Sequence, residues 1–174
     1  MSRENTPRAR WIKPAAIGAV VAALAIGGYL TVSHQPMAPQ VTFIDLKGQK
    51  ISSQSLRGKV VMINFWATSC VTCVKEMPQM VDTYNKFKGQ GLEFVAVAMK
   101  YDPPNYVVNF TETRQLPFIV ALDSGGDIAK AFDDISLTPT TYVIDKEGRI
   151  IKRYVGEPDF AALHVLLAKA LAAG

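Results

Sequence analysis

Two long apolar runs mark the centre of the folded part of the chain. Val60–Trp66 and residues 92–99 are apolar at almost every position, which is the pattern of β-strands buried on both faces. The first run is followed by apolar residues at helical spacing, namely Val74, Met77, Met80, Val81 and Tyr84. The pattern therefore predicts a buried strand, a helix and a second buried strand in the same sheet.

Shorter patterns predict the remaining elements. Alternation in residues 41–46, followed by the turn sequence KGQK, is typical of an opening hairpin. Later patterns predict a helix at 105–114, a strand at 118–122, a short helix at 127–132, a hairpin of 140–145 with 149–155, and a last helix that starts near Pro158 and buries Phe160, Leu163, Leu167 and Leu171. Strands that alternate with helices in this way predict an α/β fold with helices on both faces of the sheet.

The positive charge of the chain is concentrated at its N-terminus. The 174 residues carry a formal net charge of +4, and residues 1–13 hold four basic side chains against the single acid Glu4. The rest of the chain is close to neutral, so no basic face for nucleic acid is expected. A composition of 49% hydrophobic and 20% charged residues is that of a globular protein.

Residues 14–33 carry no charge and are mostly apolar, directly behind this basic flank. Such a stretch approaches the about 20 residues that cross a bilayer as a helix, and the basic side stays in the cytoplasm. We predict a single-pass anchor at 14–33 in a bacterial cytoplasmic membrane, a cytoplasmic N-terminus at 1–13, a linker at 34–40 and a periplasmic domain at 41–174. A cleaved signal peptide is the alternative, although its apolar core is usually about 7–15 residues long.

The only two cysteines, Cys70 and Cys73, stand where the first apolar run gives way to the helical pattern. A purely structural disulfide there would close a very short loop and constrain the unfolded chain little. A zinc site would need two further ligands, and the only histidines, His34 and His164, do not give a recognisable spacing. A redox-active dithiol needs only adjacent sulfurs and a helix N-terminus that stabilises a thiolate. The residues therefore favour redox chemistry.

The strings GKVVMINFWATSCVTCVKEMP and TPTTYVID, with the turn Gly148-Arg149-Ile150, resemble the TlpA/ResA-like membrane-anchored thiol-disulfide oxidoreductases. The resemblance covers about residues 40–174. It implies a thioredoxin-like fold, in which helices flank a central mixed β-sheet. It also implies that Cys70 is the exposed nucleophile and that Cys73 is the buried partner that resolves the mixed disulfide. Thr72 departs from the pattern, because many members have proline there.

Four further site residues follow from the same resemblance. Pro139 matches a cis-proline beside the disulfide, and Thr138 offers backbone groups to an extended substrate. Trp66 matches the aromatic lining next to the site and is expected to help bind a substrate, although it could instead simply end the buried strand. Glu76 matches an acid three residues after the second cysteine, one helical turn away and on the same helix face. If that face packs on the sheet, burial raises the pKa of Glu76 above about 4.3 and lets it exchange a proton with Cys73.

The resulting prediction is an extracytoplasmic enzyme that reduces protein disulfides and uses no cofactor. Its expected partners are disulfide- or dithiol-containing proteins, with apocytochrome c as a candidate client in cytochrome c maturation, and a membrane electron donor that re-reduces it. A dithiol oxidase of the same fold is the main alternative. A thiol peroxidase is less favoured, because this chain lacks the proline that such an enzyme has before its reactive cysteine. A copper chaperone is also less favoured, because this chain has neither the cysteine spacing nor the histidine ligand that such a protein uses.

Overall fold

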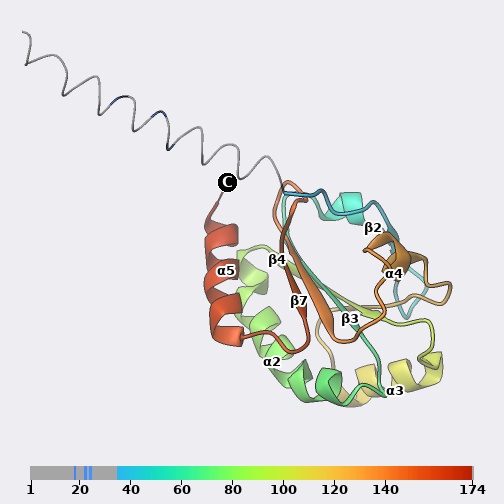
Figure 1. Cartoon of the computed structure of the whole chain (residues 1–174). Coiled ribbons are helices and arrows are strands. Elements are labelled where there is room, and N and C mark those ends of the chain that lie inside the picture. The colour runs from blue at the N-terminus through green and yellow to red at the C-terminus, as the bar shows by residue number, and fades with distance from the viewer. Residues whose placement is uncertain (1–17, 19–21, 23, 25–34, 174) are drawn as a thin grey trace, which may run out of the picture. The chain divides into compact units, whose positions relative to one another are not determined.

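A five-stranded mixed sheet lies at the centre of the computed structural model, which describes residues 18, 22, 24 and 35–173 (Figure 1). Its strands are β3 (Val60–Trp66), β4 (Leu92–Ala98), β5 (Ile119–Leu122), β6 (Thr140–Ile144) and β7 (Ile150–Val155), in the spatial order β5-β4-β3-β6-β7. β4 and β5 run parallel to β3, whereas β6 is antiparallel to β3 and to β7. All seven residues of β3 are buried, which confirms the expected central strand.

Helices cover both faces of this sheet (Figure 1). The helices are α2 (Val71–Phe87), α3 (Pro104–Arg114), α4 (Asp127–Ala131) and α5 (Phe160–Ala172). The connections β3-α2-β4 and β4-α3-β5 step in the same direction through parallel strands, so the right-handed crossover rule puts α2 and α3 on one face. α5 joins them there, and α4 packs on the other face beside the hairpin of β1 (Thr42–Ile44) and β2 (Lys50–Ser52).

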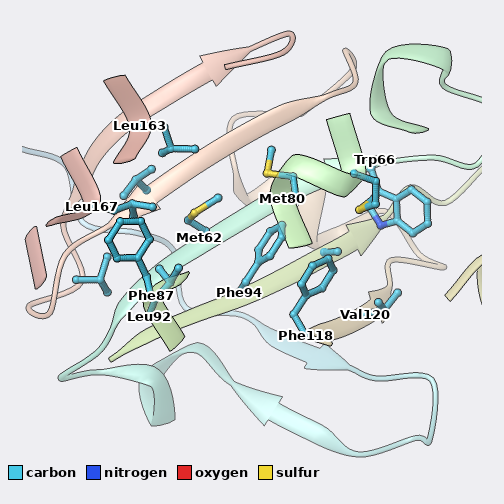
Figure 2. Packing of buried hydrophobic residues seen from close by; sticks show 14 of the residues in the cluster. Met62, Trp66, Met80, Phe87, Leu92, Phe94, Phe118, Val120, Leu163 and Leu167 are labelled. Atoms are coloured by element: carbon cyan, nitrogen blue, oxygen red, sulfur yellow. The ribbon is translucent and has the colours of Figure 1, made fainter. Parts of the chain in front are cut away.

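The alternation of side chains along β3 divides the core into two parts. Val60, Met62 and Trp66 point to the side of α2 and α5, where Leu163 and Leu167 meet them (Figure 2). The other side of β3 meets α4 and the hairpin through the buried side chains Val61, Ile63, Phe65, Phe132 and Phe43. The C-terminal end of β3, where the cysteines follow, is therefore held between two packed layers.

The predicted elements agree with the structure to within a residue or two at most ends, and the α/β sheet with helices on both faces is confirmed. One predicted core residue, Phe160, is only partly buried and packs at the margin of the core. The reason is that Asp159 caps α5, accepting the backbone N–H groups of Ala161 and Ala162, so Phe160 is the first residue of the helix and lies at its edge.

The predicted membrane anchor at 14–33 and the N-terminus at 1–13 lie outside the described residues, apart from Gly18, Ala22 and Leu24. Within the residues that the structure does describe, none of the helices combines the length and the apolar character that spanning a membrane requires. Residues 36–174 form one compact unit.

Candidate active site

Cys70 and Cys73 form a disulfide at the junction of β3 and α2, with their Cα atoms 5.2 Å apart. Cys70 is the N-cap of α2, and its Sγ accepts the backbone N–H of Cys73 at 3.2 Å. The Cys73 side chain is fully buried, whereas Cys70 is partly exposed. Because an N-cap position sits among unpaired N–H groups at the positive end of the helix, a thiolate is stabilised there. The two sulfurs therefore differ in access to other proteins.

A buried carboxylate holds the turn that leads into this disulfide. Asp102 is 5% exposed, and its two oxygens accept the backbone N–H of Thr68 at 2.6 Å and the Thr68 hydroxyl at 2.5 Å. The same loop donates the Met99 N–H to the carbonyl of Trp66 at 3.0 Å. The sequence pattern did not predict this contact. The signal it offered was an acid followed by two prolines directly after a buried strand.

Removing this carboxylate should weaken the fold at the active-site turn. We expect Asp102→Ala to lower the free energy of unfolding by about 1–3 kcal/mol, because a partly buried N–H and a hydroxyl lose a charged acceptor. Urea unfolding of the oxidised protein measures the loss. Asp82→Ala, which removes an exposed carboxylate from α2, is the matched control. Equal losses in the two variants would show that the Thr68 contacts contribute nothing.

Glu76 lies one helical turn after Cys73 on the buried face of α2 and is 1% exposed. Its Oε1 accepts a hydrogen bond from the Asn64 side-chain nitrogen at 3.2 Å. Burial raises the pKa of Glu76 to about 7, the Asn64 hydrogen bond opposes this, and the negative charge of Glu157 adds to it. The raised pKa and the buried position agree with the expectation from the sequence.

Two residues that the sequence did not mark as functional belong to this buried cluster: Asn64, which contacts Glu76, and Thr141, which contacts Asn64. The Asn64 side-chain nitrogen also donates to Thr141 Oγ1 at 2.9 Å, and both residues are buried. Asn64 could have been noticed, because it is the only polar residue in the apolar run of β3. Nothing local to Thr141 marks it, since its role depends on the pairing of β6 with β3.

The Thr138-Pro139 peptide bond is cis, as the resemblance implied. Thr140, the next residue, pairs with Phe65, so Pro139 stands at the end of β3 from which the cysteine-bearing turn departs. Pro139 is buried, and its carbonyl accepts the N–H of Gly156 at 2.8 Å. Thr138 is half-buried, with its hydroxyl oxygen 3.4 Å from the Tyr101 hydroxyl.

Trp66 was expected to line the site and help bind a substrate, which would place its side chain at the surface. The structure does not place it there. Its side chain is 0% exposed, and its ring packs against Phe110 with the ring centres 5.2 Å apart. The physical reason is that α3 covers the end of β3 on this face. The indole belongs to the same core as Cys73, so it packs beside the buried cysteine and offers no exposed surface.

His164 lies away from the cysteine pair. Its Nε2 is 2.9 Å from the Thr83 hydroxyl, and its ring packs on Phe87. In the part of the chain that the structure describes, no three side chains of His, Cys, Asp or Glu gather as metal ligands would.

Comparisons with known proteins agree with this geometry. The family model described as Redoxin matches residues 33–165. The chain is 41% identical over 133 residues to thiol-disulfide oxidoreductase ResA of Bacillus thuringiensis subsp. konkukian (strain 97-27), which covers 76% of this chain and 75% of the relative. It is 34% identical over 149 residues to thiol-disulfide oxidoreductase ResA of Bacillus subtilis (strain 168), covering 86% and 82%.

A solved structure with the same fold is the crystal structure of a thiol:disulfide interchange protein of the thioredoxin family from Chlorobium tepidum TLS. It superimposes with a TM-score of 0.72 at 28% sequence identity, covering 80% of this chain and 98% of that one. The sheet and its flanking helices therefore form a thioredoxin-like fold.

Proposed function

The chain belongs to the Redoxin family and is a thiol-disulfide oxidoreductase, and from this premise we propose that it reduces disulfides of extracytoplasmic proteins. The observation that carries the proposal is the unequal access to the two sulfurs. Cys70 is partly exposed at the N-cap of α2, and Cys73 is fully buried behind it. A client disulfide can reach only Cys70, so we assign nucleophilic attack to Cys70 and resolution to Cys73.

The reaction consists of two thiol-disulfide exchanges. The Cys70 thiolate, supported by the Cys73 N–H and the helix N-terminus, attacks one client sulfur, and the other client sulfur leaves as a thiolate. Cys73 then loses its proton and attacks Cys70 Sγ. The client leaves as a dithiol with two more electrons than before, and Cys70 and Cys73 are left as the disulfide. A membrane electron donor then returns two electrons to the enzyme.

Glu76 is proposed to exchange the proton of Cys73 in the second step. A carboxyl whose pKa is about 7 can both accept and return a proton near neutral pH. Its position one turn after Cys73, on the same buried face of α2, supports this role. Because water is largely excluded from that face, a buried proton acceptor is needed there.

The surface around Cys70 suits a protein client better than a small molecule. Val71, Tyr101 and Leu137 are 83%, 54% and 64% exposed. Val71 follows Cys70 in the chain, Leu137 precedes Thr138, and the Tyr101 hydroxyl lies 3.4 Å from the Thr138 hydroxyl. Exposed apolar side chains therefore adjoin both the cysteine turn and the cis-proline turn. We propose that an extended client segment lies over Thr138 and Pro139, with Trp66 supporting this surface from the core. Apocytochrome c is a candidate client, as the resemblance to the TlpA/ResA-like oxidoreductases implies.

We also propose that residues 14–33 anchor the chain in the bacterial cytoplasmic membrane, with 1–13 inside, 34–40 as a linker and 41–174 on the periplasmic side. The support is the uncharged apolar stretch directly behind a basic N-terminus. An oxidising compartment outside the cytoplasm would supply the disulfides that such an enzyme reduces.

The direction of the reaction is tested by the equilibrium reduction potential of the Cys70–Cys73 pair. We expect a value closer to the about −270 mV of thioredoxin than to the about −120 mV of a strong disulfide oxidant. Equilibration in glutathione and dithiothreitol buffers, read by thiol alkylation, gives the potential. A value near −120 mV, within about 30 mV, would make the protein a dithiol oxidase and overturn the reductase proposal.

A further inference from the structure

Asn64 is an unusual residue for the centre of this fold. It is the only polar residue of β3, a strand whose seven residues are all buried, and it is itself 0% exposed. A buried amide without hydrogen bonds costs free energy, so its contacts must be accounted for. Met62 and Trp66, its neighbours two residues away on either side, point to the face covered by α2 (Figure 2). Asn64 therefore points toward α2 as well.

The side-chain nitrogen of Asn64 has two hydrogens, and both have acceptors. One goes to Glu76 Oε1 on α2 at 3.2 Å, and the other to Thr141 Oγ1 on β6 at 2.9 Å. Asn64 and Thr141 are direct partners in the β3–β6 register, so their side chains lie on the same face. The amide is thus held between the helix that carries the cysteines and the strand that follows Pro139.

This contact makes the two oxygens of Glu76 unequal. Oε1 is occupied as an acceptor, whereas Oε2 accepts no hydrogen bond from the described residues. When Glu76 is ionised, turning the Asn64 amide over would place its oxygen against Oε1, and two acceptors would then face each other. The nitrogen therefore faces the carboxylate, and Oε2 is the oxygen left to take up and release the proton.

We infer that Asn64 is a positioning residue for the reaction: anchored on Thr141, it holds Glu76 Oε1 and thereby presents Oε2 as the proton-exchanging atom, one helical turn after Cys73. This inference rests on the proton-transfer role proposed above for Glu76. Among the described residues the side-chain partners of Asn64 are Glu76 and Thr141 and neither is a cysteine, so Asn64 acts through the carboxyl.

The other charged groups near Glu76 are few. Glu157, in the loop before α5, is the carboxylate whose charge acts on Glu76, and it is itself paired with Lys75 at 3.0 Å. On α5 the titratable group facing α2 is His164, which contacts Thr83 two turns further along the helix. From β3 the group that contacts Glu76 is Asn64, which is uncharged, and from β6 the uncharged Thr141 contacts Asn64. The Asn64 hydrogen bond is thus the contact that favours the charged form of Glu76.

The first test is a titration of the Glu76 carboxyl in the full-length oxidised protein, where neither cysteine titrates. Its midpoint is read from the carbon-13 chemical shift of labelled glutamate, with Glu76→Gln identifying the signal. We expect Asn64→Leu, which keeps the volume and removes the donor, to raise the midpoint by about one pH unit. Thr141→Val, which removes the anchor and keeps the shape, should raise it by less. Thr83→Val removes another buried hydroxyl of α2 and should leave it unchanged.

The second test is the pH profile of resolution, measured as release of thionitrobenzoate from its mixed disulfide with Cys70. The profile should move with the carboxyl midpoint in Asn64→Leu and should not move when Asn64→Leu is added to Glu76→Gln. An unchanged midpoint in Asn64→Leu, or an equal shift in Thr83→Val, would overturn the inference. If Asn64→Leu does not fold, an unchanged midpoint of the Glu76 titration in Thr141→Val would likewise overturn the inference.

One outcome separates this inference from the proposed function on which it rests. If the carboxyl midpoint moves in Asn64→Leu while the resolution profile of every variant, including Glu76→Gln, stays at the parent position, Asn64 still positions Glu76. The proton-transfer role of Glu76 would then be the claim that is overturned.

Discussion

Cys73→Ser is expected to accumulate as mixed disulfides with client proteins, and Cys70→Ser is expected to trap few or none. In Cys73→Ser the exposed Cys70 still attacks a client disulfide, but a serine hydroxyl cannot carry out the second exchange. In Cys70→Ser the remaining sulfur is fully buried, so a client cannot reach it. Both variants should lose multiple-turnover reduction, which makes this the largest effect that the structure predicts. Non-reducing electrophoresis of acid-quenched cells measures the trapped fraction.

The control for this experiment is the double variant Cys70→Ser/Cys73→Ser, which has no cysteine and should trap nothing. The adducts of Cys73→Ser should disappear when the samples are reduced. Equal trapping by the two single variants would mean that burial does not separate the roles of the sulfurs. Stronger trapping by Cys70→Ser would reverse the assignment of nucleophile and resolving cysteine.

Glu76→Gln is expected to slow resolution of the mixed disulfide by about 100-fold near pH 8, where the parent carboxyl is ionised and can accept the Cys73 proton. The parent rate should rise through the pKa of about 7 as the carboxylate forms, and the variant should lack this rise. Alkylation of reduced Cys70 should be nearly unchanged, because that thiolate depends on the helix N-terminus. Stopped-flow release of a thiol from the Cys70 mixed disulfide measures the step.

The same substitution should stabilise the fold at high pH. Because the pKa of Glu76 is raised from 4.5 to about 7 on folding, the folded protein holds this proton more tightly than the unfolded chain. Its stability therefore falls as pH rises from about 4.5 to about 7. Glutamine carries no such charge, so Glu76→Gln should exceed the parent by about 3 kcal/mol at pH 8 and by little at pH 4. Urea unfolding of the oxidised proteins gives both differences.

Glu112→Gln, which changes an exposed carboxyl of α3 in the same way, is the control for both measurements. A Glu76→Gln variant that resolves like the parent between about pH 5.5 and pH 8 would make Glu76 a packing residue. A variant that is slower and also less stable at pH 8 would mean that the carboxyl is not desolvated in the way its burial indicates.

Local sequence was sufficient for the parts of the site that depend on neighbouring residues. The apolar run of β3 predicted the central strand with the bounds observed, and the change to helical spacing placed Cys70 at the start of α2. The spacing of Cys73 and Glu76 predicted that they share one face of the helix. The cis bond before Pro139 came from the resemblance and not from any local pattern. These inferences need no knowledge of which elements touch.

Tertiary structure decided the environment of those residues, because desolvation and hydrogen bonding depend on what covers each group. Asn64 and Thr141 are 77 residues apart in the chain, and Thr68 and Asp102 are 34 apart. Only the pairing of β3 with β6, and the position of the loop after β4, brings these partners together. In the same way the resemblance placed Trp66 in the lining of the site, whereas the packing of Phe110 on its ring makes it a core residue, since burial belongs to the packed elements and not to the residue alone.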